Sequence, residues 1–358
     1  MNGVAKDYFP EATVQILDAL TYTTAAFRKS YPATYLFLAG RCPWLWGLFF
    51  NTLDNRVVDK IARIQRRFNN LIHCQGLEQF ILDEKPDIII TTHWLPNEVV
   101  SHLKKRHPFK ALLVTCITDY YPHAFWRDSG VDLYFAPHAD LTVRLKQLGI
   151  LENKIKVTGL PIDKVFGVRI EKVIIRAKLG LAKEKPTVLI ASGGFGIGPV
   201  AELVAEVNKI ERSLQILVIC GNNSKLQDRL YEVAKRSHHQ IKIFGFVNNM
   251  HELMDASDLM ISKPGGLTTT EAMAKALPLI ILDPIPGQET YNSEFLIKHQ
   301  AGIEAKNPAH ARLIIEQLLV EPERLKHLTE NISQLAKPHA AQEIMTIIKK
   351  RFESGRAE

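Results

Sequence analysis

The residues whose types and spacing best suit chemistry lie between Ser262 and Leu296, where two apolar segments each run into a polar loop. The first loop, Pro-Gly-Gly-Leu-Thr-Thr-Thr, opens a run of good helix formers, and free backbone N–H groups at a helix start favour phosphate. Glu271 follows within the next turn, where a carboxylate can accept hydrogen bonds from sugar hydroxyls. The second loop brings Gln288 and Glu289, with Asn292 close behind. A capped helix followed by an ordinary strand would explain the first loop alone, but the two loops together indicate a nucleotide-sugar site.

Another glycine-containing loop precedes these in the chain. The apolar run 187–194 leads into Gly194 and Gly196, and glycines let a backbone approach a phosphate closely. Pro199 suits the first turn of the helix that should follow. The spacing is GGFGIG rather than GxGxxG, and the next apolar run ends in Cys-Gly-Asn-Asn, with no acid for a ribose 2′-hydroxyl. NAD binding is therefore disfavoured. Asn222, in this Cys-Gly-Asn-Asn segment, is a candidate for binding the nucleotide sugar.

Polar residues also follow the strands that the first half of the chain predicts. His93 lies at the end of the segment 86–94, Asp119 ends the segment 112–119, and His123 comes soon after. The carboxyl ends of strands in an α/β sheet are where ligands bind, so these side chains could converge on one cleft. Each one alone is more readily structural, but their shared position makes all three candidates for acid–base catalysis.

The aromatic and basic residues between 25 and 80 suggest a different role. This stretch has helical periodicity and is rich in aromatic residues, and the segment 56–67 carries five cations against one acid. Aromatic side chains beside a basic helix can dock at an anionic lipid surface. A buried helical hairpin with a solvated basic face is the other interpretation. The residues predicted to contact the membrane, or a substrate that is part of it, are Trp44, Trp46, Arg63, Arg66 and Trp126.

The scaffold that positions these residues should consist of alternating strands and helices. Apolar runs spaced by helical segments indicate parallel sheets covered by helices. A chain of 358 residues exceeds one hydrophobic core. Glycine, proline and charged residues interrupt the pattern at 159–185, which predicts a domain boundary there. A strand is expected at 12–20, and three helical segments are expected from 308 to 352.

Composition narrows the class of protein. Hydrophobic residues make up 46% and charged residues 23%, as in an ordinary globular protein. The excess of 45 basic over 38 acidic residues is compatible with nucleic acid or with an anionic membrane. Four separated cysteines form no CxxC pair, which favours a reducing cytosol without a zinc site or disulfides. The start is too polar for a signal peptide, and no apolar run approaches the roughly 18 residues that span a bilayer. We expect a cytoplasmic protein that touches a membrane.

In order, the motifs GGFGIGP, CGNN, FGFV, SKPGGLTTTEA and PIPGQETYNSEFL resemble those of glycosyltransferase family 28, specifically the monogalactosyldiacylglycerol synthases and processive diacylglycerol glucosyltransferases. PDIIITTHW and ITDYYPHAFW are similar to the lipid-side domain of that family. The resemblance covers nearly the whole chain. It implies an α/β GT-B fold, in which two Rossmann-like domains face a cleft. The expected parts are an N-terminal acceptor domain (1–165), a C-terminal UDP-sugar donor domain (166–336) and a C-terminal helix (337–358) that crosses back to the first domain.

The resemblance also implies an activity, the inverting transfer of a hexose from UDP-galactose or UDP-glucose to the sn-3 hydroxyl of diacylglycerol. It implies an enzyme peripheral to the cytoplasmic face of an anionic membrane, with no nucleic-acid partner. By position, glycines and Thr268 would face the diphosphate, Phe246 and Val247 the uracil, Glu271 the ribose and the Gln288–Glu289 pair the hexose. The implied donor-binding residues are Gly194, Gly196, Asn222, Phe246, Val247, Gly265, Gly266, Thr268, Glu271, Gln288 and Glu289. No DxD motif is recognisable in the cleft, so neither a metal nor another cofactor is expected.

One feature of the family has no counterpart in this sequence. A glycine-rich loop with a histidine normally follows the first strand of the N-terminal domain, whereas this sequence begins where the first helix should be ending. We expect a longer natural protein with an earlier start site, because the remaining site residues are intact. A catalytically impaired UDP-sugar or lipid-binding protein is the alternative. Asp119 or His123 is the expected general base. Two other activities stay open, transfer of N-acetylglucosamine to an undecaprenyl-linked precursor and epimerisation of a nucleotide sugar.

Overall fold

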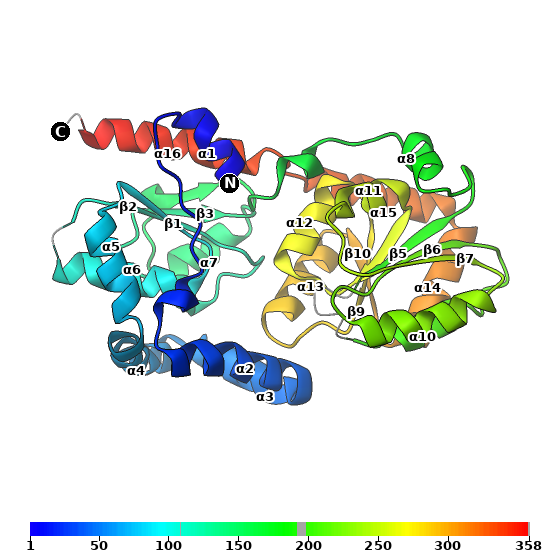
Figure 1. Cartoon of the computed structure of the whole chain (residues 1–358), viewed down its shortest axis with the longest axis horizontal. Coiled ribbons are helices and arrows are strands. Elements are labelled where there is room, and N and C mark those ends of the chain that lie inside the picture. Colours follow the sequence, from blue (N-terminus) through cyan, green and yellow to red (C-terminus); the bar gives the residue numbers. More distant parts are fainter. Residues whose placement is uncertain (108, 192–197, 357–358) are drawn as a thin grey trace. The chain divides into compact units, whose positions relative to one another are not determined.

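The computed structural model of the protein describes residues 1–107, 109–191 and 198–356. The chain forms two compact units (Figure 1). The first unit comprises Met1–Ile162, Pro286–Gln288 and His339–Glu358. The second comprises Asp163–Ile285 and Glu289–Pro338. The C-terminal helix therefore belongs to the first unit.

The first unit is mainly helical up to its first described strand. Its helices are α1 (Asn2–Tyr8), α2 (Ala25–Arg41), α3 (Pro43–Leu53), α4 (Arg56–His73), α5 (Gln75–Glu84), α6 (Trp94–Arg106), α7 (Leu141–Gln147) and α16 (Ala340–Arg356), with the 3-10 turns η1 (Ala19–Tyr22), η2 (Ala124–Trp126) and η3 (Glu152–Lys154). The run of helices over residues 25–84 agrees with the helical periodicity of that stretch.

A parallel sheet in the order β1-β2-β3-β4 forms the centre of this unit among the described residues. Its strands are β1 (Ile88–Thr91), β2 (Leu112–Cys116), β3 (Leu133–Ala136) and β4 (Ile155–Val157). On one face Val114, Leu133 and Phe135 pack against Ile344 and Met345 of α16, beside α1 (Figure 1). The alternate residues of the strands pack on the other face against α5, α6 and α7. Burial on both faces explains why these strands are continuous apolar runs.

The second unit has the doubly wound topology. Its strands are β5 (Thr187–Ala191), β6 (Gln215–Ile219), β7 (Gln240–Phe244), β8 (Leu259–Ser262), β9 (Leu279–Leu282) and β10 (Gly302–Ala305), all parallel. The order β7-β6-β5-β8-β9-β10 is the order 3-2-1-4-5-6 of dinucleotide-binding folds. The strand order therefore reverses between β5 and β8.

Helices cover both faces of this second sheet, as expected for parallel strands joined by crossover connections. They are α8 (Lys172–Lys178), α9 (Val200–Val207), α10 (Ser224–Lys235), α11 (Met250–Ala256), α12 (Gly266–Ala274), α13 (Gln288–Lys298), α14 (Pro308–Val320) and α15 (Pro322–Gln334), together with the 3-10 turn η4 (Lys164–Gly167). One core joins Ile190 and Val218 of the strands to Val204 of α9 and Ile314 of α14.

Two expectations about local structure are wrong. Residues 12–18 form no strand, and the chain then enters η1, whose Leu20 N–H donates to the Asp18 carboxylate at 2.9 Å. Ile16 is 77% exposed, so the apolar pattern of this stretch does not mark a buried strand. The loop expected to extend to Glu289 ends earlier, because α13 begins at Gln288.

Candidate functional site

The carboxyl ends of β5 and β8 lie beside each other where the second sheet reverses its strand order. Ligands of doubly wound sheets bind in the crevice at this point. Gly194 and Gly196, predicted to contact the diphosphate, lie outside the described residues. Gly198 has a φ of +135°, which favours glycine, and α9 begins two residues later.

An ion pair that the sequence analysis missed stands beside Gly198. Lys263 follows β8 and Asp283 follows β9, and Nζ of the lysine lies 2.8 Å from Oδ2 of the aspartate. A Cβ atom on Gly198 would lie 3.5 Å from Cε of Lys263 and 3.7 Å from Oδ2 of Asp283. The lysine side chain is only 15% exposed. The sequence signal was the position of both residues directly after buried strands. The pair places a cation next to the loop predicted to hold a diphosphate.

The start of α12 places the first backbone N–H groups of a helix at the same sheet edge. Gly265 is the N-cap, Gly266 is the first helical residue, and the half-buried Thr268 lies in the first turn. The first N–H groups of a helix have no intrahelical partner and favour an anion. The positions of Gly265, Gly266 and Thr268 thus suit the phosphate contact predicted for them, which stays a prediction.

Glu271, in the second turn of α12, has a perturbed acidity. Burial raises the pKa of its carboxyl to about 7, with a smaller contribution from the negative charge of Asp163. Ionising this group without a ligand is costly because the charge loses water. A carboxylate that is poorly compensated in the empty protein is typical of binding and catalytic positions. This property is consistent with the predicted contact to ribose hydroxyls.

Glu289 lies close to both loops that carry the candidate donor residues. Its Oε2 accepts a hydrogen bond from the Ile285 N–H at 2.7 Å. Its Oε1 lies 3.9 Å from the position of a Cβ atom built on Gly265. The structure therefore brings Glu289 close to the N-terminus of α12. Gln288 occupies the first position of α13.

The remaining donor candidates share only the edge of the sheet. Asn222 follows β6 and is exposed, while Phe246 and Val247 follow β7. Phe246 is 66% exposed and Val247 is half-buried. Since all the strands are parallel, these residues lie at the same carboxyl edge as Lys263. An exposed aromatic side chain at that edge is available for a ligand base.

In the first unit, the structure assigns His123 a structural role. Its Nε2 lies 2.8 Å from the carbonyl oxygen of Phe50, and its Nδ1 accepts from the Phe125 N–H at 3.1 Å. The ring is buried, and burial lowers its pKa. A neutral ring that donates from Nε2 and accepts at Nδ1 has no free lone pair for a proton. The prediction of His123 as general base is therefore not supported.

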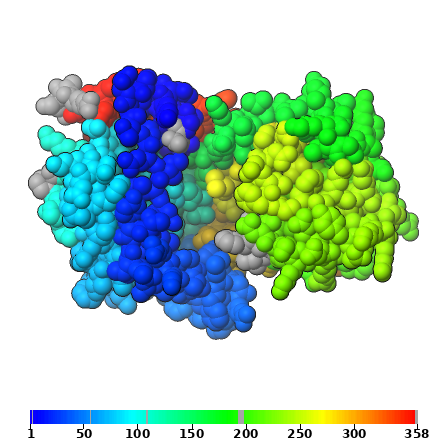
Figure 2. Space-filling model, viewed as in Figure 1, coloured from blue at the N-terminus to red at the C-terminus, as the bar shows by residue number. Residues whose placement is uncertain are grey.

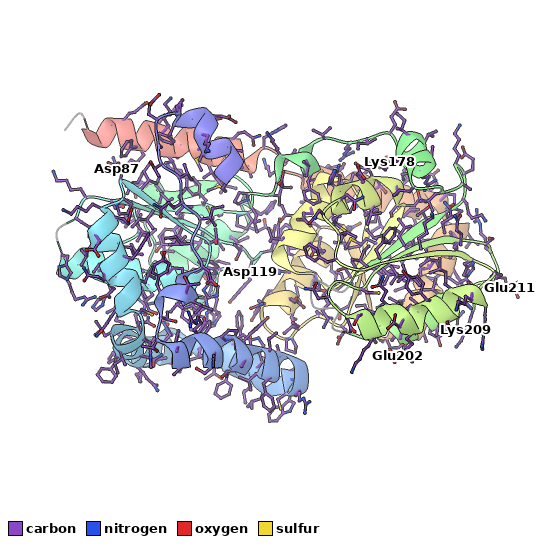
Figure 3. The ribbon with its side chains drawn as sticks, in the orientation of Figure 1. Asp87, Asp119, Lys178, Glu202, Lys209 and Glu211 are labelled. Atoms are coloured by element: carbon purple, nitrogen blue, oxygen red, sulfur yellow. The ribbon has the colours of Figure 1, made fainter. Side chains whose placement is uncertain are left out.

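The other two acceptor-side candidates lie at the carboxyl edge of the first sheet. Asp119 is half-buried on the loop that follows β2 (Figure 3). His93 follows β1 and is exposed, and its Nδ1 caps α6 by accepting from the Leu95 N–H at 3.1 Å. Because β1 and β2 are parallel neighbours, their carboxyl ends lie at the same edge. Asp119 is thus the better candidate base.

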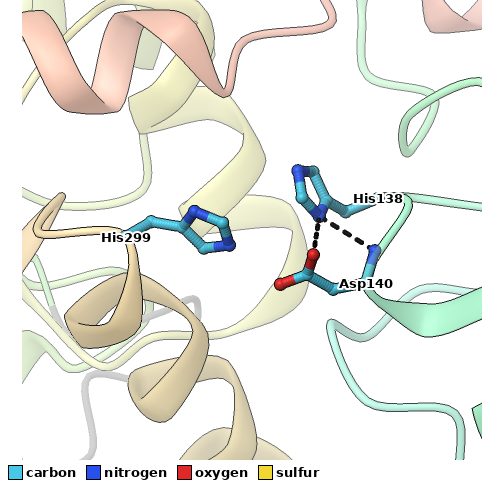
Figure 4. A group of neighbouring side chains, drawn as sticks. All are labelled: His138, Asp140 and His299. Atoms are coloured by element: carbon cyan, nitrogen blue, oxygen red, sulfur yellow. Dashed lines mark hydrogen bonds and ion pairs between the residues drawn. The ribbon is translucent and has the colours of Figure 1, made fainter. Parts of the chain in front are cut away.

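His138 and Asp140, to which the sequence analysis gave no role, follow β3 at that edge. Nδ1 of His138 accepts from the Asp140 N–H at 3.2 Å and lies 3.4 Å from the Asp140 carboxylate (Figure 4). Their position after a strand is the same signal that selected Asp119. They add titratable groups to the carboxyl edge of this sheet.

Arg63 and Arg66 point into the first unit, so the prediction that they meet lipid headgroups is wrong. Arg63 pairs with Asp59 at 2.8 Å, and Arg66 pairs with Asp59 at 3.0 Å and with Glu98 at 3.3 Å. The two arginine side chains are 14% and 17% exposed. Buried carboxylates attract these cations to the inner face of α4, since an unpaired buried charge is unfavourable. Arg66 also lies over the ring of Phe125.

The outer face of α4 is apolar. Five side chains spaced three or four residues apart form one exposed stripe. They are Val57, Ile61, Ile64, Phe68 and Ile72, with exposed fractions of 69%, 69%, 71%, 65% and 46%. The helix is amphipathic, as its periodicity indicates, but the apolar side faces outward.

The tryptophans divide between surface and interior. Trp44 of α3 is 70% exposed, and α2 and α3 lie at the surface of their unit (Figure 2). Trp46 is half-buried, with its ring centroid 5.2 Å from that of Tyr35. Trp126 is only 4% exposed in the core, so its assignment to a lipid-facing surface is not supported. In the described ranges of the chain, no helix combines the length and apolarity that crossing a bilayer requires.

Solved structures share this architecture. MurG from Acinetobacter baumannii has a TM-score of 0.59 and 16% identity, covering 77% of this chain and 76% of that chain. A UDP-GlcNAc 2-epimerase from Neisseria meningitidis, bound to UDP-GlcNAc, has a TM-score of 0.61 and 16% identity, covering 77% of this chain and 80% of that chain. These similarities confirm the predicted GT-B fold class.

Family comparisons specify the class further. Residues 2–162 match the model of monogalactosyldiacylglycerol (MGDG) synthase, and residues 187–356 match the glycosyltransferase family 28 C-terminal domain. A processive diacylglycerol beta-glucosyltransferase of Bacillus mycoides is 31% identical over 305 residues, 85% of this chain and 77% of the relative. One from Bacillus pumilus is 31% identical over 290 residues, which are 80% of this chain and 75% of the relative. The chain belongs to this family of diacylglycerol glycosyltransferases, as its motifs predicted.

Proposed function

We propose that this protein is an inverting glycosyltransferase that moves a hexose from a UDP-sugar to 1,2-diacylglycerol at a membrane surface. The observation that carries the proposal is the group of residues at the carboxyl edge of the second sheet. Glu271 has a raised pKa, Lys263 is a largely buried cation, and Glu289 reaches the N-terminus of α12. In a family whose members are named for diacylglycerol, these groups suit the ribose, diphosphate and hexose of the donor.

In the proposed reaction, the hydroxyl oxygen of diacylglycerol attacks C1 of the hexose from the face opposite the diphosphate. The new C1–O bond forms as the bond between C1 and the diphosphate oxygen breaks, and the hydroxyl proton passes to Asp119. UDP leaves with its electron pair. The N–H groups at the start of α12 and the ammonium of Lys263 offset the developing negative charge. The proposal includes no metal ion.

The acceptor is part of a membrane, and we propose that the exposed side chains of α3 and α4 bring the enzyme to it. We call this set the apolar face: Trp44, Leu48, Phe49, Val57, Ile61, Ile64, Phe68 and Ile72. Burying one large apolar side chain contributes about 1.5–3 kcal/mol, so insertion of a few of them into the interfacial layer is sufficient for binding. Because Arg63 and Arg66 are paired internally, this binding should depend little on anionic lipid.

The test combines the full chain with vesicles that contain diacylglycerol and with UDP-glucose or UDP-galactose, and it detects glycolipid by mass spectrometry. UDP-glucose is the first donor to try, because the curated relatives are named glucosyltransferases. Excess chelator should leave the rate unchanged. A product only with an undecaprenyl-linked acceptor, or interconversion of the UDP-sugar without acceptor, would replace the proposal by one of the two other activities. Binding of UDP without turnover would indicate a binding protein.

A further inference from the structure

Asp54, between α3 and α4, is bonded to two parts of the loop that carries Asp119. The Tyr121 hydroxyl donates to its Oδ2 at 2.5 Å, and the Ala124 N–H donates to its Oδ1 at 2.8 Å. Arg144 of α7 donates to the same Oδ2 at 2.7 Å. The Asp54 side chain is 10% exposed. One carboxylate therefore gathers donors from the loop 119–126 and from α7.

The last turn of α3 adds a further bond to this loop. The carbonyl oxygen of Phe50 accepts from His123 Nε2 at 2.8 Å, and the Phe50 ring lies 4.2 Å from the His123 ring, centroid to centroid. The loop is thus bonded at three points to the end of α3, through the His123 ring to Phe50 and through the Tyr121 hydroxyl and the Ala124 N–H to Asp54, the residue that follows the helix. The same helix exposes Trp44 and other members of the apolar face.

We propose that Asp54 is a positioning residue that fixes the loop 119–126 and couples its conformation to the contact of α3 with lipid. The inference rests on the proposed function, because the loop matters for catalysis only if Asp119 serves the acceptor. Seating α3 at the bilayer would fix its last turn, and Asp54 would transmit that position to Tyr121 and Ala124. The device makes full activity depend on the membrane that contains the acceptor.

The geometry explains why a carboxylate is needed at this position. Oδ2 accepts from both Tyr121 and Arg144, while Oδ1 accepts from Ala124. In Asp54→Asn, the Nδ2 group replaces one oxygen and cannot accept from either donor, so Arg144 loses its counter-ion. The side chain keeps its size, so the loop loses the Tyr121 hydrogen bond and Asp54 loses its ion pair with Arg144 without a cavity. Small displacements of catalytic groups lower rates about a hundredfold.

The test measures kcat for glycolipid formation, donor affinity and vesicle binding for Asp54→Asn. We expect kcat to fall at least tenfold, while the Kd for UDP-glucose by calorimetry and sedimentation with vesicles change less than twofold. Tyr121→Phe, which removes one hydrogen bond, should lower kcat severalfold. The matched control is Asp132→Asn, because Asp132 pairs with Lys104 at 2.6 Å and accepts from the Leu113 N–H at 2.8 Å in the same unit. This control should lower the Tm and leave kcat within twofold.

Hydrogen exchange tests the coupling without relying on turnover. Diacylglycerol-containing phosphatidylcholine vesicles should slow exchange in residues 43–53 and 119–126 of the wild-type protein, and only in 43–53 of Asp54→Asn. Unchanged kcat in Asp54→Asn, an equal loss in Asp132→Asn, or a loop response that persists in Asp54→Asn would overturn the inference. If the wild-type protein makes no glycolipid, the proposed function fails, and the exchange result still decides whether Asp54 couples the two segments.

Discussion

Ionisation of Glu271 should control donor affinity across neutral pH. Its pKa is raised to about 7 by burial, so a large fraction is protonated at pH 7. Only the carboxylate can accept hydrogen bonds from two ribose hydroxyls with full charge assistance. If the ionised form alone binds, affinity for the donor should be about tenfold higher at pH 8 than at pH 6, since each pH unit below the pKa lowers the ionised fraction about tenfold.

The magnitudes fit this role. A rise from 4.5 to about 7 corresponds to about 3 kcal/mol for ionising the group in the empty protein. A hydrogen bond to a charged group contributes about 1.5–3 kcal/mol, so two ribose hydroxyls can offset that cost.

Ionisation of Glu271 has opposite effects on donor binding and on folding, because it favours binding and lowers the free energy of unfolding of the empty protein. The folded state holds the proton of Glu271 more tightly than the unfolded state does. The stability that this proton contributes is therefore complete below the ordinary pKa of a glutamate and is lost as pH rises through about 7. Glu271→Gln should therefore raise the stability of the empty protein at pH 8.

Calorimetric titration with UDP-glucose checks this prediction at several pH values. UDP-glucose is preferred to UDP because the terminal phosphate of UDP has its own ionisation near pH 6. Glu271→Gln should bind about tenfold more weakly than the wild type at pH 8 and show no slope from pH 6 to 8. Glu206→Gln is the control in the same unit, because Glu206 pairs with Lys209 and Arg312 at the surface and should retain the wild-type slope. A flat wild-type profile, or a slope that survives in Glu271→Gln, would refute the reasoning.

Three further predictions concern charge and exposure. Lys263→Ala should weaken UDP-glucose binding at least tenfold, whereas Asp283→Asn, which removes the competing carboxylate, should tighten it. Calorimetry that finds a change of affinity in the same direction for both variants would contradict a contact between Lys263 and the diphosphate. Ile61→Glu should reduce sedimentation with vesicles at low and high salt, whereas Lys60→Glu on the same helix should have little effect; the opposite order would restore an electrostatic mode of binding. Arg66→Met should lower the free energy of unfolding by about 3–5 kcal/mol in urea titrations, because it removes the cation between the carboxylates of Asp59 and Glu98. A loss below about 1 kcal/mol would show that this pairing contributes little to stability.

The sequence predicted the central strands well because the described strands are all parallel and those at the centres of the sheets, such as β3, β5 and β8, are buried along their length. Such strands are short continuous apolar runs, and their spacing by helices identifies the α/β class. The segment 12–20 has a similar apolar content but lies at the surface, with Ile16 exposed. Apolar content alone cannot distinguish the two, because burial depends on whether another element provides a sheet edge.

The donor-side candidates were selected because each lies on a loop or helix that follows a strand, and Lys263, which the same signal could have selected, follows β8 directly. Asp54 and His123 show the limit of that approach. His123 occupies the expected place after a strand, yet its two nitrogens are bonded to backbone groups, one of them on α3. Asp54 follows no strand, and its partners lie 67 to 90 residues away along the chain. Only the tertiary structure brings these groups together.

The orientation of α4 shows why a periodic pattern cannot identify a membrane-facing side. The pattern has an apolar face and a basic face, and either can be buried. Asp59 lies on the basic face, and Glu98 lies on α6, so turning this face inward neutralises Arg63 and Arg66. The cost of burying these charges is offset only because acids meet them. The apolar stripe is then left outside, where a soluble protein gains nothing from it. A lipid surface would reverse that balance, so the inward salt bridges and the outward apolar face together favour a helix adapted to the membrane interface.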